Sequence, residues 1–208
     1  MEPQIAEDEE LQKVREWWKT NGTAILVGIG IGIAALAGFN GFKLYTESQS
    51  ESASTLFSQF QSAISEEKLD KANALAEDLK LNYDSSPYTA SALLISAAED
   101  FRSENVDLAR QKYAWVIANQ EDGAMLHTAR LRMAYIEIDT GNAEAALVLL
   151  DVENTGGYGS QYAELKADAH KHSGNNDEAA KWYAEAITAL PAGSAYTEIL
   201  QAKQAASQ

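Results

Sequence analysis

The side chains that most often carry chemistry are few in this chain and are poorly spaced for a reaction. His170 and His172 are two residues apart, so on a helix they point to different faces and cannot chelate one metal ion as an i, i+4 pair could. His127 stands alone. We therefore expect packing or solvated histidines and no metal site.

Glycine-rich stretches could in principle present a nucleophile or hold a phosphate. Ser160 follows glycines, but the run Gly157-Tyr-Gly-Ser160 lacks the Gly-x-Ser-x-Gly order of a nucleophile elbow. Neither this loop nor Gly28-Ile-Gly-Ile-Gly32 follows a predicted strand or carries the Lys-Ser/Thr pair that grips phosphate. Both stretches are predicted to be structural.

Adjacent acids, the usual general acid–base groups, fall at predicted turns or helix starts, where the helix dipole favours negative charge. They are Glu66-Glu67, Glu121-Asp122 and Asp177-Glu178. The chain has no cysteine, which removes thiolate catalysis and cysteine-based zinc sites. The sequence therefore predicts neither an enzyme nor a bound cofactor.

Composition limits the size and the partners of the molecule. With 208 residues, 46% of them hydrophobic, the chain can build one domain and an appendage. It has 16 basic and 31 acidic residues for a net charge of -15, and the region from Leu44 onward holds 25 acids and 12 bases. A negative surface repels nucleic acid, so nucleic-acid binding is excluded as a function class.

An uncharged run of 23 residues, 20–42, is the first element that must position the rest. As a helix it would rise roughly 34 Å, enough to cross a hydrocarbon core of about 30 Å. Three basic residues precede it (Lys13, Arg15 and Lys19) and only Lys43 follows closely, which favours an N-terminus inside the cell. Aromatic rings suited to both headgroup levels flank the run: Trp17, Trp18, Phe42 and Tyr45.

This orientation predicts a single-pass inner-membrane protein with three parts: a cytoplasmic tail (1–19), a transmembrane helix (20–43) in the lipid bilayer and a periplasmic domain (44–208). A cleaved signal peptide is the alternative, because Ala35-Leu-Ala37 before Gly38 imitates a signal-peptidase site. The long acidic leader, and an apolar stretch that continues past this point, favour an uncleaved anchor. A mature N-terminus at Gly38 would indicate a secreted protein instead.

Small residues recur every four positions on two neighbouring faces of the predicted span. In lipid, such spacing lets another helix approach closely, and packing drives the association. The pattern suggests a helix partner in the membrane, although glycine is also commoner in spanning helices generally. The candidate packing residues are Ala24, Gly28 and Gly32 on one face, and Gly30, Ala34 and Gly38 on the other.

The region after the span contains a repeat of about 34 residues. In its clearest copy, residues 160–191, Ala179, Tyr183, Ala186 and Pro191 resemble the second helix of a tetratricopeptide repeat in type and spacing. Corresponding alanines stand 37, 37 and 33 residues apart, at Ala72, Ala109, Ala146 and Ala179. We therefore predict an all-α fold in which a tetratricopeptide-like solenoid of about four repeats, with a closing helix near the C-terminus, follows the single transmembrane helix.

First helices of stacked repeats form an extended concave face, which is the surface most suited to binding a partner. Helix phasing places five candidate groove residues there: Phe101, Leu131, Tyr135, Asp168 and Lys171. For Phe101 and Leu131, ordinary burial between repeats is the alternative, because buried apolar residues are the commoner case.

The complete layout resembles the YfgM-type ancillary subunits of the bacterial SecYEG translocon. The resemblance rests on Trp17-Trp-Lys-Thr-Asn-Gly22 before the glycine-rich span, Tyr45 after it, and repeats that include 128–134 and 141–146. It implies a non-enzymatic inner-membrane protein associated with SecYEG and with a PpiD-type periplasmic chaperone, assisting translocating polypeptides. The alternative is a secreted periplasmic repeat protein that coordinates envelope or cell-wall machinery.

Overall fold

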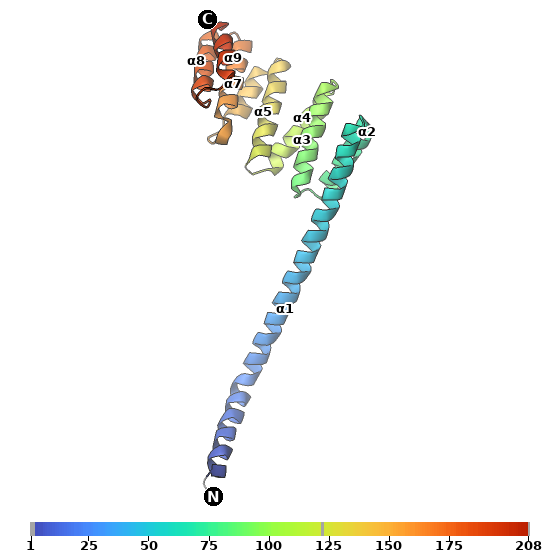
Figure 1. The fold of residues 1–208 in the computed structure, drawn as a ribbon, viewed down its shortest axis with the longest axis vertical. Helices are drawn as coiled ribbons and strands as arrows, with labels where there is room; N and C mark the ends of the chain where they lie inside the picture. The colour runs from blue at the N-terminus through green and yellow to red at the C-terminus, as the bar shows by residue number, and fades with distance from the viewer. Residues whose placement is uncertain (1–2, 122, 208) are drawn as a thin grey trace. The chain divides into compact units, whose positions relative to one another are not determined.

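The computed structural model describes residues 3–121 and 123–207, and these form helices with no strand among them. The chain divides into two compact units, Met1–Ser52 (unit 1) and Ala53–Gln208 (unit 2). Helix α1 (Pro3–Ser65) supplies unit 1 and the first helical segment of unit 2 (Figure 1). The predicted all-α class is confirmed.

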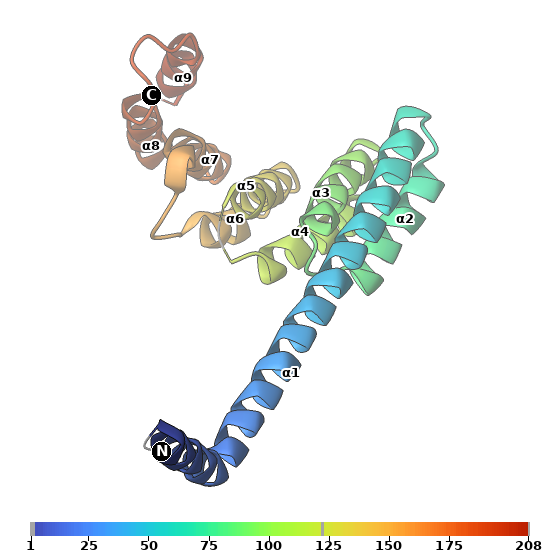
Figure 2. The ribbon, with the colours of Figure 1, turned by 60° about the horizontal axis from the view of Figure 1, so that its bottom comes forward.

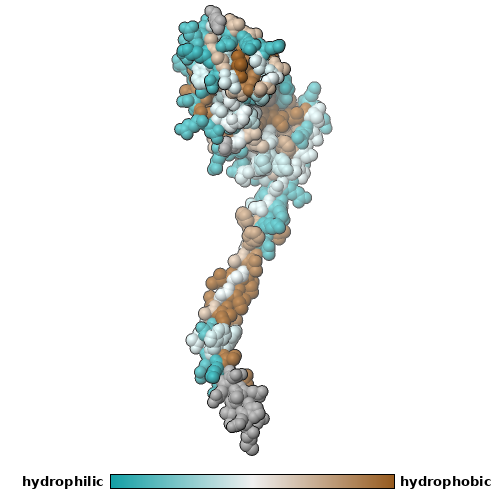
Figure 3. All heavy atoms as spheres, turned by 60° about the vertical axis from the view of Figure 1, so that its left-hand side comes forward, coloured by the Kyte–Doolittle hydropathy of each residue, from teal (hydrophilic) through white to brown (hydrophobic). Residues whose placement is uncertain are grey.

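Unit 1 is one helix with an apolar surface. Its most apolar window has a mean hydropathy of 2.1, and only 6% of that window is buried. A core helix of a soluble domain would be mostly buried, so this helix has the length and composition of a membrane-crossing one. Figure 3 shows the apolar residues gathered along it.

Unit 2 is a stack of antiparallel helical hairpins. The end of α1 packs beside α2 in both ribbon views (Figures 1 and 2), and α3 with α4, α5 with α6 and α7 with α8 form the next three pairs. Helix α9 packs on α8 and closes the stack. The bounds after α1 are α2 (Leu69–Asn82), α3 (Pro87–Arg102), α4 (Val106–Asn119), α5 (Ala124–Asp139), α6 (Ala143–Leu150), the 3₁₀ helix η1 (Gly156–Tyr158), α7 (Gly159–His172), α8 (Asn176–Thr188) and α9 (Tyr196–Ala205).

Alanine at the helix crossings explains why these pairs form. The four periodic alanines of the second helices, Ala72, Ala109, Ala146 and Ala179, are all buried. A methyl side chain leaves room for the facing helix to approach, and larger neighbours such as Tyr183 and Leu200 then fill the space toward the next element. The core therefore consists of successive clusters of small and large buried residues along the stack.

Each hairpin turns through one residue in the left-handed region. These residues are Glu67 (φ 56°), Glu104 (φ 64°), Gly141 (φ 85°) and Gly174 (φ 76°). In every case the next amide donates a hydrogen bond to a carbonyl five residues earlier, as in Asn105 N to Asp100 O at 2.8 Å. This is the Schellman closure of a helix end, and it sets the direction in which the second helix returns.

Buried polar groups tie the first two repeats together. Lys112 in α4 donates hydrogen bonds to Ser96 Oγ (2.6 Å) and Asn73 Oδ1 (2.7 Å) and forms an ion pair with Asp100. Lys112 and Asp100 are 8% and 4% exposed. Because a buried charge is tolerated only when it is paired and hydrogen-bonded, this network fixes how α2, α3 and α4 meet.

We predict that Lys112→Met destabilises unit 2 by about 3 kcal/mol, because it leaves Asp100 buried without its partner. Urea unfolding of the full chain, followed by circular dichroism, measures the change. Lys181→Met is the matched control, since Lys181 forms an exposed pair with Glu178, and it should leave the midpoint almost unchanged. Equal midpoints for the two variants would contradict the stated role of the network.

Candidate functional site

A hollow of about 550 Å³ opens on the faces of the first helices of the third and fourth repeats. We call it the inner groove. Helix α5 contributes Thr128, Leu131, Arg132 and Tyr135; η1 contributes Tyr158; α7 contributes Gln161, Glu164, Leu165 and Asp168; and α9 contributes Tyr196 and Lys203. Spacings of three and four residues along α5 and α7 place each set on one helix face.

Apolar and aromatic side chains form one end of the inner groove. Tyr135 is 48% exposed and meets Phe101 of α3 edge to face, with ring centroids 6.1 Å apart. Leu131 is half-buried against the core of the third repeat. An exposed tyrosine supported by a second ring offers a large amphipathic contact that loses little conformational freedom on binding.

The structure brings together three of the five predicted groove residues, Leu131, Tyr135 and Asp168. Phe101 lies behind Tyr135 and packs against the core, while Lys171 does not line the hollow. Sequence reasoning missed Arg132, Glu164 and both residues of α9. Helix phase could have found Glu164, which lies one turn before Asp168 on the same face.

An ionic cluster forms the other end of the groove. Lys203 Nζ lies 2.7 Å from Glu164 Oε1 and 2.9 Å from Asp168 Oδ2. Tyr196 donates its hydroxyl to Glu164 at 2.9 Å, and Tyr183 donates to Asp168. Two carboxylates one turn apart would repel each other, and the ammonium between them removes that repulsion.

The cluster shifts the pKa values of its members. Burial, and then the hydrogen bond to Asp168, raise the pKa of Tyr183 well above its ordinary value of 10.0. Burial and Glu164 raise the pKa of Tyr196. Burial alone would lower the pKa of Lys203, but the hydrogen bonds to Glu164 and Asp168 outweigh it, and the pKa rises. All three protons are therefore held more tightly in the folded chain.

The charges that line the inner groove cancel. Arg132 and Lys203 are its two cations, and Glu164 and Asp168 are its two carboxylates. The cations differ, because Lys203 is bound within the cluster whereas Arg132 is exposed and has no acidic partner within 4.0 Å in the described part of the chain. The lining of the groove is thus electrically neutral, although the chain as a whole has a net charge of -15.

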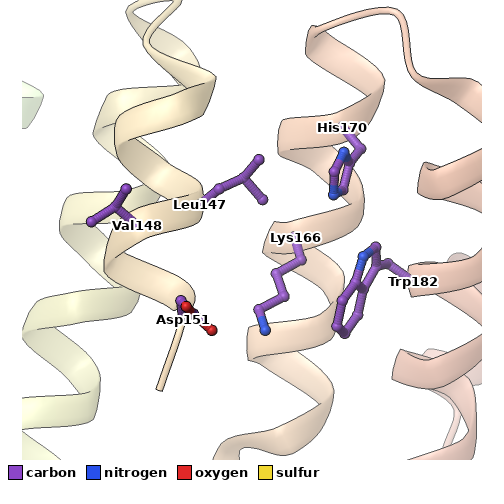
Figure 4. A pocket seen from close by; sticks show the side chains of 6 residues that line it. All are labelled: Leu147, Val148, Asp151, Lys166, His170 and Trp182. Carbon is purple, nitrogen blue, oxygen red and sulfur yellow. The ribbon is translucent and has the colours of Figure 1, made fainter. Parts of the chain in front are cut away.

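A second, smaller hollow of about 350 Å³ lies between α6, α7 and α8 (Figure 4). Its α7 residues, Lys166 and His170, point to the side of that helix away from Glu164 and Asp168. Lys166 Nζ lies 4.5 Å from the ring centroid of Trp182, a cation–π distance, and Leu147 lies across from His170. His170 Nδ1 is buried without a hydrogen bond in the described structure.

The six small residues of the predicted span all lie on exposed helix surface in unit 1. A Cβ atom added at Gly28, Gly30, Gly32 or Gly38 would meet nothing within 4 Å. Their surfaces are therefore open to a neighbouring helix, although a small-residue face alone does not identify a partner.

Comparison with known proteins shows which family shares this architecture. Residues 15–207 match the model of the tetratricopeptide repeat-like domain family. A Neisseria gonorrhoeae protein named ancillary SecYEG translocon subunit is 27% identical over 98% of both chains. Proteins of the same name from Escherichia coli and Haemophilus influenzae are 26% and 20% identical, each covering 83% of its own length and 83% and 82% of this chain. No solved structure matches. The resemblance predicted from the sequence is confirmed.

We predict that unit 2 loses stability as pH rises above about 10, the ordinary pKa of tyrosine. The raised pKa values of Tyr183, Tyr196 and Lys203 stabilise the fold fully at lower pH, and this contribution is lost as the pH rises toward the folded-state values. Urea midpoints at pH 8 to 11 should fall less steeply for Tyr183→Phe. Tyr45→Phe, an exposed position in unit 1, should keep the original slope, and identical slopes for all three proteins would exclude this assignment.

Proposed function

Because the chain belongs to the tetratricopeptide repeat-like domain family, we propose that it acts as a membrane-anchored interaction scaffold, namely an ancillary subunit of the SecYEG translocon. The observation that carries the proposal is the 98% end-to-end correspondence with a curated relative of that name, since it includes both the apolar helix and the repeats. The proposal includes no catalytic step.

The membrane arrangement is part of this proposal. The chain crosses the inner membrane once through residues 20–43, with residues 1–19 in the cytoplasm and 44–208 in the periplasm. The apolar helix of unit 1 and the excess of basic residues before it support this orientation. In this arrangement the inner groove lies on the side where polypeptides leave the translocon.

Translocating polypeptides are the ligands that we assign to the inner groove. Its tyrosines and leucines suit exposed apolar side chains of an unfolded segment, and its hydroxyl and amide groups can bond a peptide backbone. The resemblance to YfgM-type subunits also implies a PpiD-type periplasmic chaperone as a neighbour, which we include in the proposal. The scaffold would thus hold emerging chains close to that chaperone.

A photo-crosslinking residue at Gln161, inside the groove, should capture a secretory chain stalled in the translocon of intact cells. Combining this crosslinker with the double substitution Leu131→Ala and Tyr135→Ala should lower the crosslinking yield roughly tenfold, because each truncation removes apolar contact. Leu81→Ala is the control: Leu81 is 77% exposed on α2, outside the groove. A crosslinking yield that stays the same in the groove variants would refute polypeptide binding at this site.

In the membrane, the proposal predicts that Gly28→Leu with Gly32→Leu lowers copurification of SecYEG roughly tenfold, by removing ~1–2 kcal/mol of close helix packing. Gly41→Leu is the control, since it also replaces an open glycine with leucine but on a different part of the helix surface. Quantitative immunoblotting of detergent-solubilised complexes provides the measurement. Full recovery of SecYEG with the double variant would remove the small-residue face from the proposal.

A further inference from the structure

The inner groove and the domain around it differ in charge. Residues from Leu44 to Gln208 carry 25 acids and 12 bases, a net charge of -13, whereas the four charged residues that line the groove sum to zero. Long-range attraction depends on the whole charge distribution, but short-range contacts depend on what lines the site. The two parts therefore act on different steps of binding.

Association is governed by the domain charge. A field from a net charge of -13 attracts cationic segments and repels anionic ones over about 10 Å at 0.1 M salt. Steering of this kind changes association rates by about tenfold or more, and salt suppresses it. Lysine or arginine beside an apolar segment would thus speed its arrival.

Dissociation is governed by the groove itself. Glu164 and Asp168 are already satisfied by Lys203 and by two tyrosine hydroxyls, so neither carboxylate needs a cation from the ligand. What remains accessible is the aromatic and aliphatic surface around Tyr135, together with the guanidinium of Arg132, whose positive charge is offset by the net charge of -1 of the cluster of Glu164, Asp168 and Lys203. The residence time of a ligand therefore follows its buried apolar area.

Building on the proposed function, we infer that the inner groove takes extended polypeptide segments in which a large apolar side chain is flanked by lysine or arginine. The flanking cations set the association rate, and the apolar side chain sets the dissociation rate. The charge of the ligand therefore affects its long-range attraction to the domain and not its contacts inside the groove.

Three synthetic peptides test this inference, sharing one Leu-Phe-Leu core with lysine, serine or glutamate on both sides. The full chain is reconstituted in nanodiscs of zwitterionic lipid, and stopped-flow fluorescence gives both rate constants. At about 20 mM salt the lysine peptide should associate at least about tenfold faster than the glutamate peptide, and at about 0.5 M salt the two should converge. Their dissociation rates should agree within about twofold at both salt concentrations.

Two groove variants and one control variant test which side chains set each rate. Tyr135→Ala should raise the dissociation rate of all three peptides about tenfold, while Leu81→Ala, outside the groove, should change neither rate. Arg132→Gln leaves the groove lining with a net charge of -1, so the lysine peptide should now dissociate more slowly than the glutamate peptide.

The outcomes distinguish this inference from the function on which it rests. Peptide binding in which wild-type dissociation depends on flanking charge, or association does not, overturns the inference and leaves the groove as a binding site. Failure of all three peptides to bind overturns polypeptide binding by the inner groove, which is the part of the proposed function on which the inference rests. Binding that Tyr135→Ala leaves unchanged places the peptide outside the groove and overturns both.

Discussion

The close packing of the helix pairs in unit 2 depends on small side chains at the points where the paired helices cross. At Ala72, Ala109, Ala146 and Ala179 a single methyl group faces the partner helix, and each is buried. Helix axes can then lie about 8–10 Å apart, the range in which side chains interdigitate. Since each repeat contacts only its neighbours, the spacing of one pair fixes where the next begins. The inner groove exists because this spacing sets α7 beside α5 with room for side chains between them.

The repeat was predictable because two features of the sequence mark it: the regular spacing of the alanines and the glycines at the turns. It was less readable toward the N-terminus, where Glu67 and Glu104 occupy the left-handed turn position that Gly141 and Gly174 fill later. A non-glycine residue in this conformation costs roughly 1–2 kcal/mol, so residue type alone argues against a turn there. The Schellman hydrogen bonds and the packing of the following helix impose it.

The candidate site was predictable only where helix phase decides position. Leu131, Tyr135 and Asp168 follow from the faces of α5 and α7, whereas Lys171 lies three residues beyond Asp168 and outside the hollow. Tyr196 and Lys203 could not be predicted to line the groove from the sequence. Their position depends on the path of the segment 189–195, which sets the direction of α9. The bond between Lys203 and Glu164 joins residues 39 apart and belongs to tertiary structure alone.

Equivalent positions along the stack show how the joints between repeats differ. Asn73 hydrogen-bonds Asp100 at the first joint, and Arg110 binds Glu137 through both carboxylate oxygens, at 2.7 and 3.1 Å, at the second. At the third joint the same two positions hold Leu147 and His170, which both line the second hollow, and a leucine side chain cannot form the hydrogen bond found at the first two joints. Directional bonds specify one register, whereas apolar contacts are non-directional. The inner groove spans this third joint, so its two walls are joined mainly by packing, together with the hydrogen bond between His127 and Tyr162.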